Sequence, residues 1–221
     1  MRDKSEVLRL LENPGVIAVI RTRNAAQALG VCEALVKGGV IALEITMTVP
    51  GAIQAIREAS QRFGTQALVG VGTVLDAQTC RQAIDAGAEF VVSPITAPEV
   101  ARAANERGRP VMLGACTPTE AQTAHLAGAD FIKLFPAEAF GPGYIKSLKA
   151  PLPHLKIVPT GGVDLDTIES FFRAGCSAVG VGSSLVQPKL VDSGDWGALS
   201  ALAQKFTSLA LSFRTGSAKP A

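Results

Sequence analysis

Short apolar runs rich in valine and isoleucine recur along this chain, and a segment of helical period follows each of them. This alternation predicts parallel strands buried on both faces and joined by helices. The predicted strands span residues 16–20, 40–46, 67–73, 90–93, 110–116, 131–135, 156–160 and 178–182. Eight strand–helix units fit a closed barrel better than an open doubly wound sheet, which has about six strands. We therefore expect the α/β class and a (β/α)8 TIM barrel.

The predicted helices support the same count. An amphipathic helix over residues 5–12 precedes the barrel as an extra element, and Asn24 is a suitable N-cap for the next helix. The other helices are expected at 24–37, after Pro50, and at 77–86, 98–107, 118–127, 144–148, 166–174 and 196–213. Glycine ends four of them before a strand, at residues 38–40, 86–88, 127–129 and 174–176, because it tolerates the left-handed backbone of a helix end.

No interior stretch resembles a linker, so we expect a single domain over residues 1–221. Its barrel core should run from about residue 15 to residue 213, and residues 215–221 should form a frayed tail. The mean hydropathy is high, at +0.29, yet charge, glycine or proline interrupts every apolar stretch before the roughly 18 residues needed to cross a bilayer. We expect no membrane association.

Charge and composition narrow the functional classes. The net charge is +2 with dispersed basic residues, and aromatic residues make up 5%, which disfavours nucleic-acid binding. Acidic residues occupy the N-terminus, where a secretory signal would be apolar, and the four cysteines form no C-x-x-C pair. We interpret them as reduced core thiols of a cytoplasmic protein. With two histidines, His125 and His154, we expect neither a metal centre nor a cofactor that depends on one.

Two charged residues interrupt apolar strands, Glu44 in the second and Lys133 in the sixth. Strand alternation places Lys133 on one face with Phe131 and Phe135. If these faces point inward, a lysine and a carboxylate share a dry barrel interior. One interpretation is a buried ion pair that only holds strands together. The other, which we favour, is a lysine that loses its proton readily, so that its neutral amine can attack a carbonyl group.

Glycine-rich turns follow the seventh and eighth strands, at residues 159–162 and 180–184. Backbone N–H groups in such turns can hold a phosphate, and barrels of this class often bind one at that position. The alternative is that the glycines only permit tight turns. Other candidates at strand ends are Thr73, Pro94 and Arg21, whose guanidinium could hold a carboxylate. Cys116 is more typical of a small core residue than of a nucleophile.

Four segments together resemble the 2-keto-3-deoxy-6-phosphogluconate (KDPG) and 4-hydroxy-2-oxoglutarate aldolase family. They are residues 43–46 (Leu-Glu-Ile-Thr), 69–75 (Val-Gly-Val-Gly-Thr-Val-Leu), 131–138 (Phe-Ile-Lys-Leu-Phe-Pro-Ala-Glu) and 158–163 (Val-Pro-Thr-Gly-Gly-Val). The likeness runs from about residue 15 to residue 186, with the segments in the family's order and spacing. The combination of the lysine strand with Pro-Thr-Gly-Gly is highly specific.

This resemblance implies a class I aldolase in which Lys133 forms the Schiff base and Glu44 is the general acid and base. It implies that Thr73 binds the pyruvate carboxylate and that Pro94 and Phe135 form pocket walls. The residues that it assigns to the distal hydroxyls and the phosphate are Thr160, Gly161, Gly162, Gly182, Ser183 and Ser184. Many members have an arginine where this chain has Thr48, and Arg21 resembles the arginine that another branch uses to bind the carboxylate.

The implied reaction cleaves KDPG to pyruvate and glyceraldehyde 3-phosphate in sugar-acid breakdown (the Entner–Doudoroff pathway). Cleavage of 4-hydroxy-2-oxoglutarate to pyruvate and glyoxylate is expected as well. The resemblance also implies that the enzyme needs no metal or other cofactor. It implies a cytoplasmic homotrimer whose only partner is its substrate, a small 2-keto acid. The alternative substrate is 2-keto-3-deoxy-6-phosphogalactonate. More distant alternatives are a phosphosugar isomerase or synthase and a barrel that binds a phosphorylated metabolite without catalysis.

Overall fold

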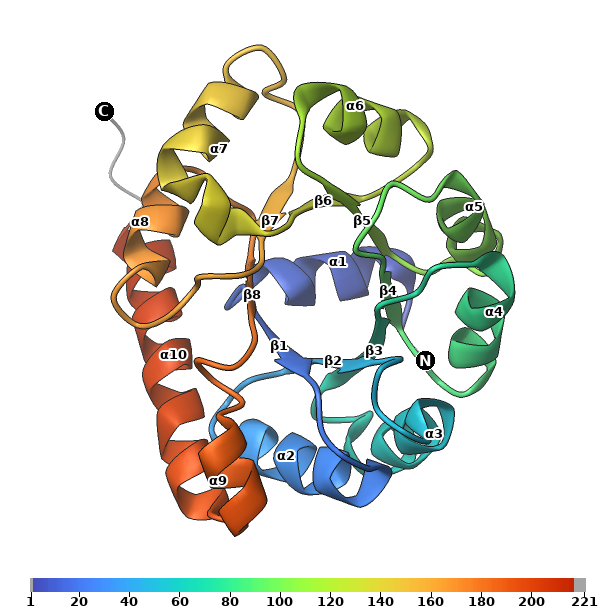
Figure 1. The fold of residues 1–221 in the computed structure, drawn as a ribbon, viewed down its shortest axis with the longest axis vertical. Helices are drawn as coiled ribbons and strands as arrows, with labels where there is room; N and C mark the ends of the chain where they lie inside the picture. Colours follow the sequence, from blue (N-terminus) through green and yellow to red (C-terminus); the bar gives the residue numbers. More distant parts are fainter. Residues whose placement is uncertain (1, 217–221) are drawn as a thin grey trace.

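Eight parallel strands form one sheet that curves into a barrel in the computed structural model, which describes residues 2–216 (Figure 1). The strands are β1 (Val16–Ile20), β2 (Ala42–Thr46), β3 (Leu68–Gly72), β4 (Phe90–Val92), β5 (Val111–Ala115), β6 (Phe131–Leu134), β7 (Ile157–Pro159) and β8 (Val179–Val181). They pair in chain order from β1 to β7, and β8 pairs with β1. A single bridge between Thr160 and Gly180 joins β7 to β8 and closes the barrel.

All helices except α1 lie around the outside of the strands, as Figure 1 shows. The helices are α1 (Lys4–Glu12), α2 (Ala25–Lys37), α3 (Ala52–Phe63), α4 (Ala77–Asp85), α5 (Pro98–Glu106), α6 (Pro118–Leu126), α7 (Gly141–Lys149), α8 (Ile168–Arg173), α9 (Pro188–Ser193) and α10 (Trp196–Gly216), with the 3-10 turn η1 (Ala137–Ala139). The expected (β/α)8 barrel with an extra N-terminal helix is confirmed. Among the described residues, no helix is long and apolar enough to span a membrane.

Several boundaries differ from those expected. Most strands are a residue or two shorter at their ends, because the terminal residues turn out of the barrel ladder. Helix α7 begins three residues before Tyr144, and α9 was not predicted, because its six residues are too few to show a helical period. The expected frayed tail overlaps the end of α10 at residues 215–216, and residues 217–221 lie outside the described part of the chain.

The capping signals in the sequence are confirmed. The Asn24 side chain accepts a hydrogen bond from the backbone N–H of Gln27 at 2.9 Å. In each of the four segments that end a helix before a strand, the middle residue is a glycine with a left-handed backbone. These glycines are Gly39 (φ 85°), Gly87 (φ 111°), Gly128 (φ 94°) and Gly175 (φ 89°). A side chain would be strained at any of them, so the glycines fix where each helix turns into the next strand.

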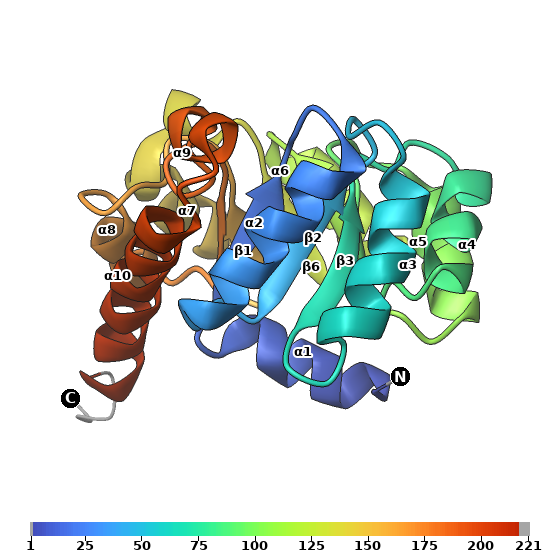
Figure 2. The same cartoon turned by 90° about the horizontal axis from the view of Figure 1, so that it is seen from below.

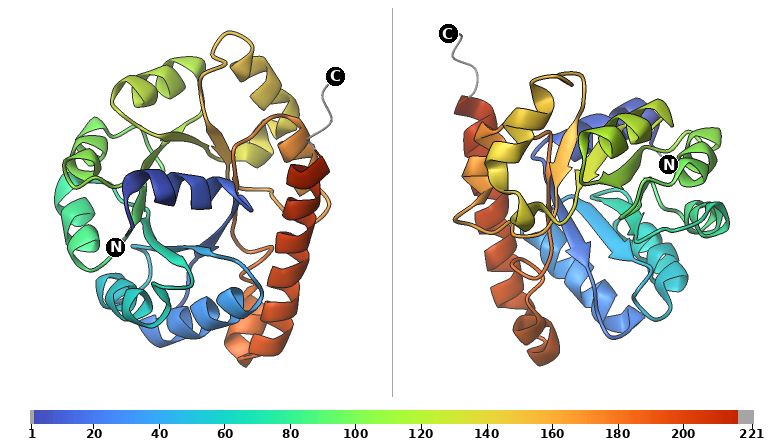
Figure 3. Two further views of the ribbon diagram at one scale, coloured as in Figure 1. Left: turned by 180° about the vertical axis from the view of Figure 1, so that it is seen from behind. Right: turned by 45° about the horizontal axis from the view of Figure 1, so that its top comes forward.

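The N-terminal end of the barrel is filled with apolar side chains and closed by α1. In Figure 2, α1 lies at the end of the barrel opposite α9, and the left panel of Figure 3 shows it crossing the barrel opening. Val7 and Leu11 of α1 are fully buried. They pack against an inward-facing apolar layer made of Ile17, Ala42, Leu68, Phe90, Val92, Met112, Phe131, Val158 and Ala178.

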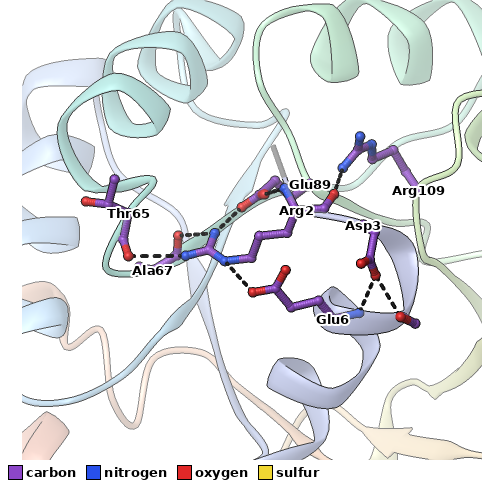
Figure 4. A network of polar contacts seen from close by, with 8 residues as sticks. Arg2, Asp3, Glu6, Thr65, Ala67, Glu89 and Arg109 are labelled. Carbon is purple, nitrogen blue, oxygen red and sulfur yellow. Dashed lines mark hydrogen bonds and ion pairs between the residues drawn. The ribbon is translucent and has the colours of Figure 1, made fainter.

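Polar contacts hold α1 in this position (Figure 4). The Arg2 guanidinium donates to Glu89 Oε2 at 2.8 Å, and the Arg2 backbone N–H donates to the other Glu89 oxygen at 3.0 Å. Lys4 pairs with Asp130 at 2.9 Å, and Glu12 at the far end of the helix pairs with Lys156 at 2.7 Å. Ion pairs at both ends therefore keep α1 across the barrel. With one end apolar and closed, polar side chains inside the barrel can meet solvent only near the other end.

Candidate active site

A lysine and a glutamate face each other inside the barrel, one layer above the apolar residues. Lys133 Nζ lies 3.8 Å from Glu44 Oε1, and each side chain is 3% exposed. The prediction that these two charges share the barrel interior is thus confirmed. Burying either charge alone would cost several kcal/mol, so each stabilises the other. At 3.8 Å the contact is too long for a direct hydrogen bond, and no other described group donates to Glu44 Oε1.

Burial raises the pKa of the Glu44 carboxyl above its ordinary value of 4.5. The charges of Lys133 and Arg21 act in the opposite direction and lower this pKa, although burial has the larger effect. A carboxyl group with a raised pKa can hold a proton at a pH where an exposed glutamate has lost it. Glu44 is therefore suited to give and take a proton beside the Lys133 amine.

Glycines on the neighbouring strands make room for this pair. A Cβ atom at Gly72 would lie 1.9 Å from Glu44 Oε1, so only glycine leaves space for the glutamate beside β3. Gly114 of β5 is the register partner of Lys133. A Cβ there would lie 2.1 Å from the Pro94 carbonyl oxygen. The loop after β4 therefore bends in over the barrel beside Lys133, which agrees with the expected position of Pro94 near the site.

A pocket of about 260 Å³ opens at the C-terminal ends of β1, β6, β7 and β8. The predicted site residues that line it are Arg21, Phe135, Thr160, Gly161, Gly162, Gly182, Ser183 and Ser184. Phe135 connects this pocket to the buried pair, because Lys133 Nζ lies 5.4 Å from the centre of its ring. The structure thus brings together most of the residues selected from the sequence, next to Lys133. Thr73 and Pro94, which follow β3 and β4, do not line it, and neither do Lys133 and Glu44 themselves.

Arg21 follows β1 and lines the pocket, but it is exposed rather than enclosed. Its guanidinium makes no hydrogen bond or ion pair with the other residues of the described chain. It lies near enough to Glu44 to lower the pKa of that carboxyl. Thr48, in contrast, is 2.7 Å from the Thr46 hydroxyl, which itself donates to the Ile20 carbonyl. In this chain Thr48 must donate to Thr46, and Arg21 has its donors free for an anion.

Thr73 has a left-handed backbone, with φ of 60°. Among the described residues it is the one non-glycine with positive φ, which is costly for a β-branched side chain. Backbone strain of this kind occurs often at functional sites. Thr73 directly follows β3 and Glu44 lies on the neighbouring strand β2, so the strained residue stands at the edge of the buried pair.

The turns after β7 and β8 line the pocket together. Gly161 and Gly162 have φ values of 93° and 70°, so both backbone conformations require glycine. A Cβ at Gly182 would meet no atom within 4 Å, which shows that this residue borders open space. The Ser184 hydroxyl donates to the Val163 carbonyl and ties the two turns together. Backbone N–H groups in such paired turns can receive a phosphate.

Sequence reasoning missed five residues that line the pocket: Val19, Glu138, Val163, Val186 and Pro188. Glu138 belongs to the Phe-Pro-Ala-Glu segment named above, but the sequence did not show which way its side chain points.

The expectation that all four cysteines are core thiols is wrong for Cys116. Unlike the other three cysteines it is only half-buried, because β5 ends before it at Ala115. His125 and His154 are both exposed on the surface. Residues 2–216 bring no three histidine, cysteine or acidic side chains together as a metal site would require.

Comparisons with known proteins agree on one family. The family model described as KDPG and KHG aldolase matches residues 7–202. The chain is 38% identical to the 2-dehydro-3-deoxy-6-phosphogalactonate aldolase of Escherichia coli, over 77% of this chain and 83% of that enzyme. It is 35% identical to the 2-dehydro-3-deoxy-phosphogluconate aldolase of Pseudomonas aeruginosa, over 86% of each chain.

The structural comparison adds a chemical observation made on a relative. The crystal structure of KDPG aldolase from Legionella pneumophila, with pyruvate captured at low pH as a covalent carbinolamine intermediate, superimposes with a TM-score of 0.83. The identity is 29%, and the match covers 89% of this chain and 96% of that one. The barrel described above is therefore shared with an aldolase that bonds covalently to pyruvate.

Proposed function

Because this chain belongs to the KDPG and KHG aldolase family and is therefore a lyase, we propose that it cleaves KDPG to pyruvate and glyceraldehyde 3-phosphate through a Schiff base on Lys133. The observation that carries this proposal is the buried pair of Lys133 and Glu44 beside the pocket. An ion pair with a purely structural role would not require a pocket next to it. A phosphosugar isomerase or synthase has no use for a lysine at this position.

The reaction begins when the neutral amine of Lys133 attacks the C2 ketone and forms a C–N bond. Glu44 protonates the hydroxyl group of this carbinolamine, which leaves as water and gives an iminium ion. Glu44, now a carboxylate, takes the proton of the C4 hydroxyl while the iminium accepts the electron pair of the C3–C4 bond, so the aldehyde leaves and a pyruvate enamine remains. Glu44 then gives a proton to C3, and water releases pyruvate from Lys133. The raised pKa of Glu44 suits a group that carries a proton in both directions.

The remaining predicted residues divide between the two ends of the substrate. Arg21 and Thr73 bind the carboxylate of the 2-keto acid, because Arg21 offers free donors and Thr73 stands beside Glu44. Phe135 and Pro94 form walls around Lys133. The distal hydroxyls and the phosphate bind at Thr160, Gly161, Gly162, Gly182, Ser183 and Ser184, and all six line the pocket.

Trapping with borohydride tests the mechanism directly. Pyruvate and borohydride together should leave one reduced adduct on the protein, and peptide mass spectrometry should find it on Lys133. Lys133→Arg should show no adduct and no turnover, because a guanidinium stays protonated. Lys146→Arg, a change at an exposed lysine of α7, is the matched control and should trap as well as the parent. An adduct on Lys37 or Lys146, or no adduct on the parent, would show that the mechanism is wrong.

A second candidate substrate is 2-keto-3-deoxy-6-phosphogalactonate. The observation that favours it is the 38% identity to an aldolase named for that substrate, against 35% for one named for phosphogluconate. The two compounds share the 2-keto acid head and the phosphate, so both meet the same ends of the pocket. A side-by-side cleavage assay with both compounds and with unphosphorylated 4-hydroxy-2-oxoglutarate, which we also expect to be cleaved, decides among them by kcat/KM.

We further propose that the enzyme acts as a homotrimer in the cytoplasm, in sugar-acid breakdown. Support for an assembly comes from Leu75 and Ile95, which are 53% and 49% exposed on loops that leave the neighbouring strands β3 and β4. Large apolar side chains exposed together are typical of interfaces. Support for the cytoplasm comes from the four free cysteines and from a phosphorylated substrate.

A further inference from the structure

Glu138 is an exposed carboxylate on the wall of the pocket. It lies in η1, directly after the lysine strand, and it faces the turn after β7. The backbone N–H of Ala137 donates to the Thr160 carbonyl at 2.9 Å, so this 3-10 turn is held against the end of β7. This backbone hydrogen bond between η1 and the residue after β7 therefore holds Glu138 in its position.

The glycine pair of the turn makes room for this side chain. A Cβ at Gly162 would lie 2.6 Å from Glu138 Cβ, which real side chains do not approach. A Cβ at Gly161 would lie 3.4 Å from Glu138 Oε2. The two glycines thus allow the carboxylate to lie directly over the turn. Side chains there would push Glu138 out of the pocket.

The carboxylate is available for a ligand. Within residues 2–216 the Glu138 side chain makes no hydrogen bond or ion pair. An ionised carboxylate can only accept hydrogen bonds, so hydroxyl and N–H groups are its natural partners. A substrate that extends from Lys133 towards the turn must pass this acceptor.

We propose that Glu138 selects the substrate by accepting a hydrogen bond from a hydroxyl of its distal half. This inference rests on the proposed function and deepens it. KDPG has a hydroxyl on C5, before its phosphate, whereas 4-hydroxy-2-oxoglutarate has a carboxylate as C5. The first offers a donor to Glu138, and the second has no hydroxyl at that position. Glu138 therefore favours hydroxylated sugar-acid aldols over the dicarboxylic aldol.

The test compares kcat/KM for both substrates in the parent, Glu138→Gln and Glu138→Ala. For KDPG we expect a loss of about threefold with Gln, which can still accept a hydrogen bond, and about tenfold with Ala. For 4-hydroxy-2-oxoglutarate we expect both variants to stay within about twofold of the parent, because this substrate has no C5 hydroxyl to donate to Glu138. Glu99→Gln is the matched control, since Glu99 is an exposed acid in the first turn of α5 and does not line the pocket.

A loss for KDPG alone distinguishes selection from a structural role, which would lower kcat/KM for both substrates together. A ratio of the two kcat/KM values that stays within about twofold of the parent in both variants would overturn the proposal. Borohydride trapping of pyruvate is measured in parallel, because pyruvate lacks the distal half. If trapping on Lys133 succeeds in all variants while the ratio is unchanged, the role of Glu138 is wrong and the aldolase mechanism stands. If the parent does not trap pyruvate, the proposed function itself fails.

Discussion

At the scale of single residues, the chemistry depends on a carboxyl and an amine that water cannot reach easily. Glu44 and Lys133 are each 3% exposed, and Gly72 provides the space in which the carboxylate lies. The same burial that stabilises a proton on Glu44 makes its charged form costly. Arg21 differs from both, because it is exposed and acts on Glu44 only through its charge.

Replacing Glu44 should change how stability depends on pH. Its pKa is above 4.5 in the folded protein, so from about pH 4.5 upward the folded state holds more protons than the unfolded chain. The free energy of unfolding of the parent therefore falls as pH rises through this window, and the decrease is complete above the raised pKa. Glu44→Gln has no such loss, so in urea unfolding its stability relative to the parent should increase as pH rises above about 4.5.

A control variant at Glu120 should show the opposite dependence of stability on pH. Hydrogen bonds from the backbone N–H groups of Cys116 and Thr117, together with the Thr117 side chain, lower the pKa of Glu120. The contribution of Glu120 is present above its unfolded pKa and is lost as pH falls. Glu120→Gln should therefore lose stability relative to the parent as pH rises. A Glu44→Gln difference that is constant across the pH range would contradict the raised pKa.

Arg21→Ala should weaken catalysis for every 2-keto acid substrate, because all share the carboxylate head. Loss of a charge-assisted contact costs about 1.5–3 kcal/mol, or roughly 10- to 150-fold in kcat/KM. Removal of the Arg21 charge should also raise the pKa of Glu44 further and shift the acidic limb of the pH–rate profile upward. Ser184→Ala is the comparison variant, and it should lower kcat/KM mainly for phosphorylated substrates. A change within about threefold for Arg21→Ala would mean that the carboxylate binds elsewhere.

At the scale of elements, α1 is part of the barrel core although it precedes the barrel. Its Val7 and Leu11 complete the apolar layer, and Arg2 just before it neutralises the buried Glu89. The Glu89 side chain is 5% exposed, so without Arg2 its charge would have no compensating cation. This arrangement explains why the amphipathic helix must lie across the barrel rather than beside it.

Arg2→Ala should therefore destabilise the protein by about 2–3 kcal/mol, because it leaves a buried carboxylate unpaired. Adding Glu89→Gln to this variant should recover part of the loss, since a neutral amide is less costly to bury than a charge. The control is Arg107→Ala, which removes an ion pair whose side chains are 44% and 58% exposed and should cost under about 1 kcal/mol. Equal losses for Arg2→Ala and Arg107→Ala in denaturant unfolding would contradict the role of α1.

At the scale of the whole molecule, the least paired seam of the barrel coincides with the proposed phosphate site. Across the described chain, β7 and β8 share the Thr160–Gly180 bridge and one hydrogen bond from Ser177 to Ile157. The glycine turns on both sides of this seam are free of ladder hydrogen bonds. Their N–H groups can therefore point towards a ligand, which the fully paired strands β1 to β6 do not permit.

The expected assembly is also a property of the whole molecule. Light scattering during gel filtration should give the parent three times the chain mass of 22.8 kDa. Leu75→Glu combined with Ile95→Glu should reduce this mass to that of one chain, because charge cannot be buried in an apolar contact without cost. Leu126→Glu, at a leucine of α6 that is 76% exposed, should leave the mass unchanged. A parent of single-chain mass would contradict the trimer.

Local sequence patterns were enough to predict the order and type of the elements, the face that Lys133 shares with Phe131 and Phe135, and the glycine turns. These features follow from local rules: strand alternation sets which residues share a face, and positive φ requires glycine. Packing between elements settled that this face points into the barrel, that α1 closes one end, that Arg21 is exposed and that Glu138 faces the pocket. Each of these depends on how elements distant in sequence meet, such as Glu138 with Gly162, and no local pattern encodes such a distance. Short elements such as α9 likewise owe their form to packing, because too few residues are present to show a period.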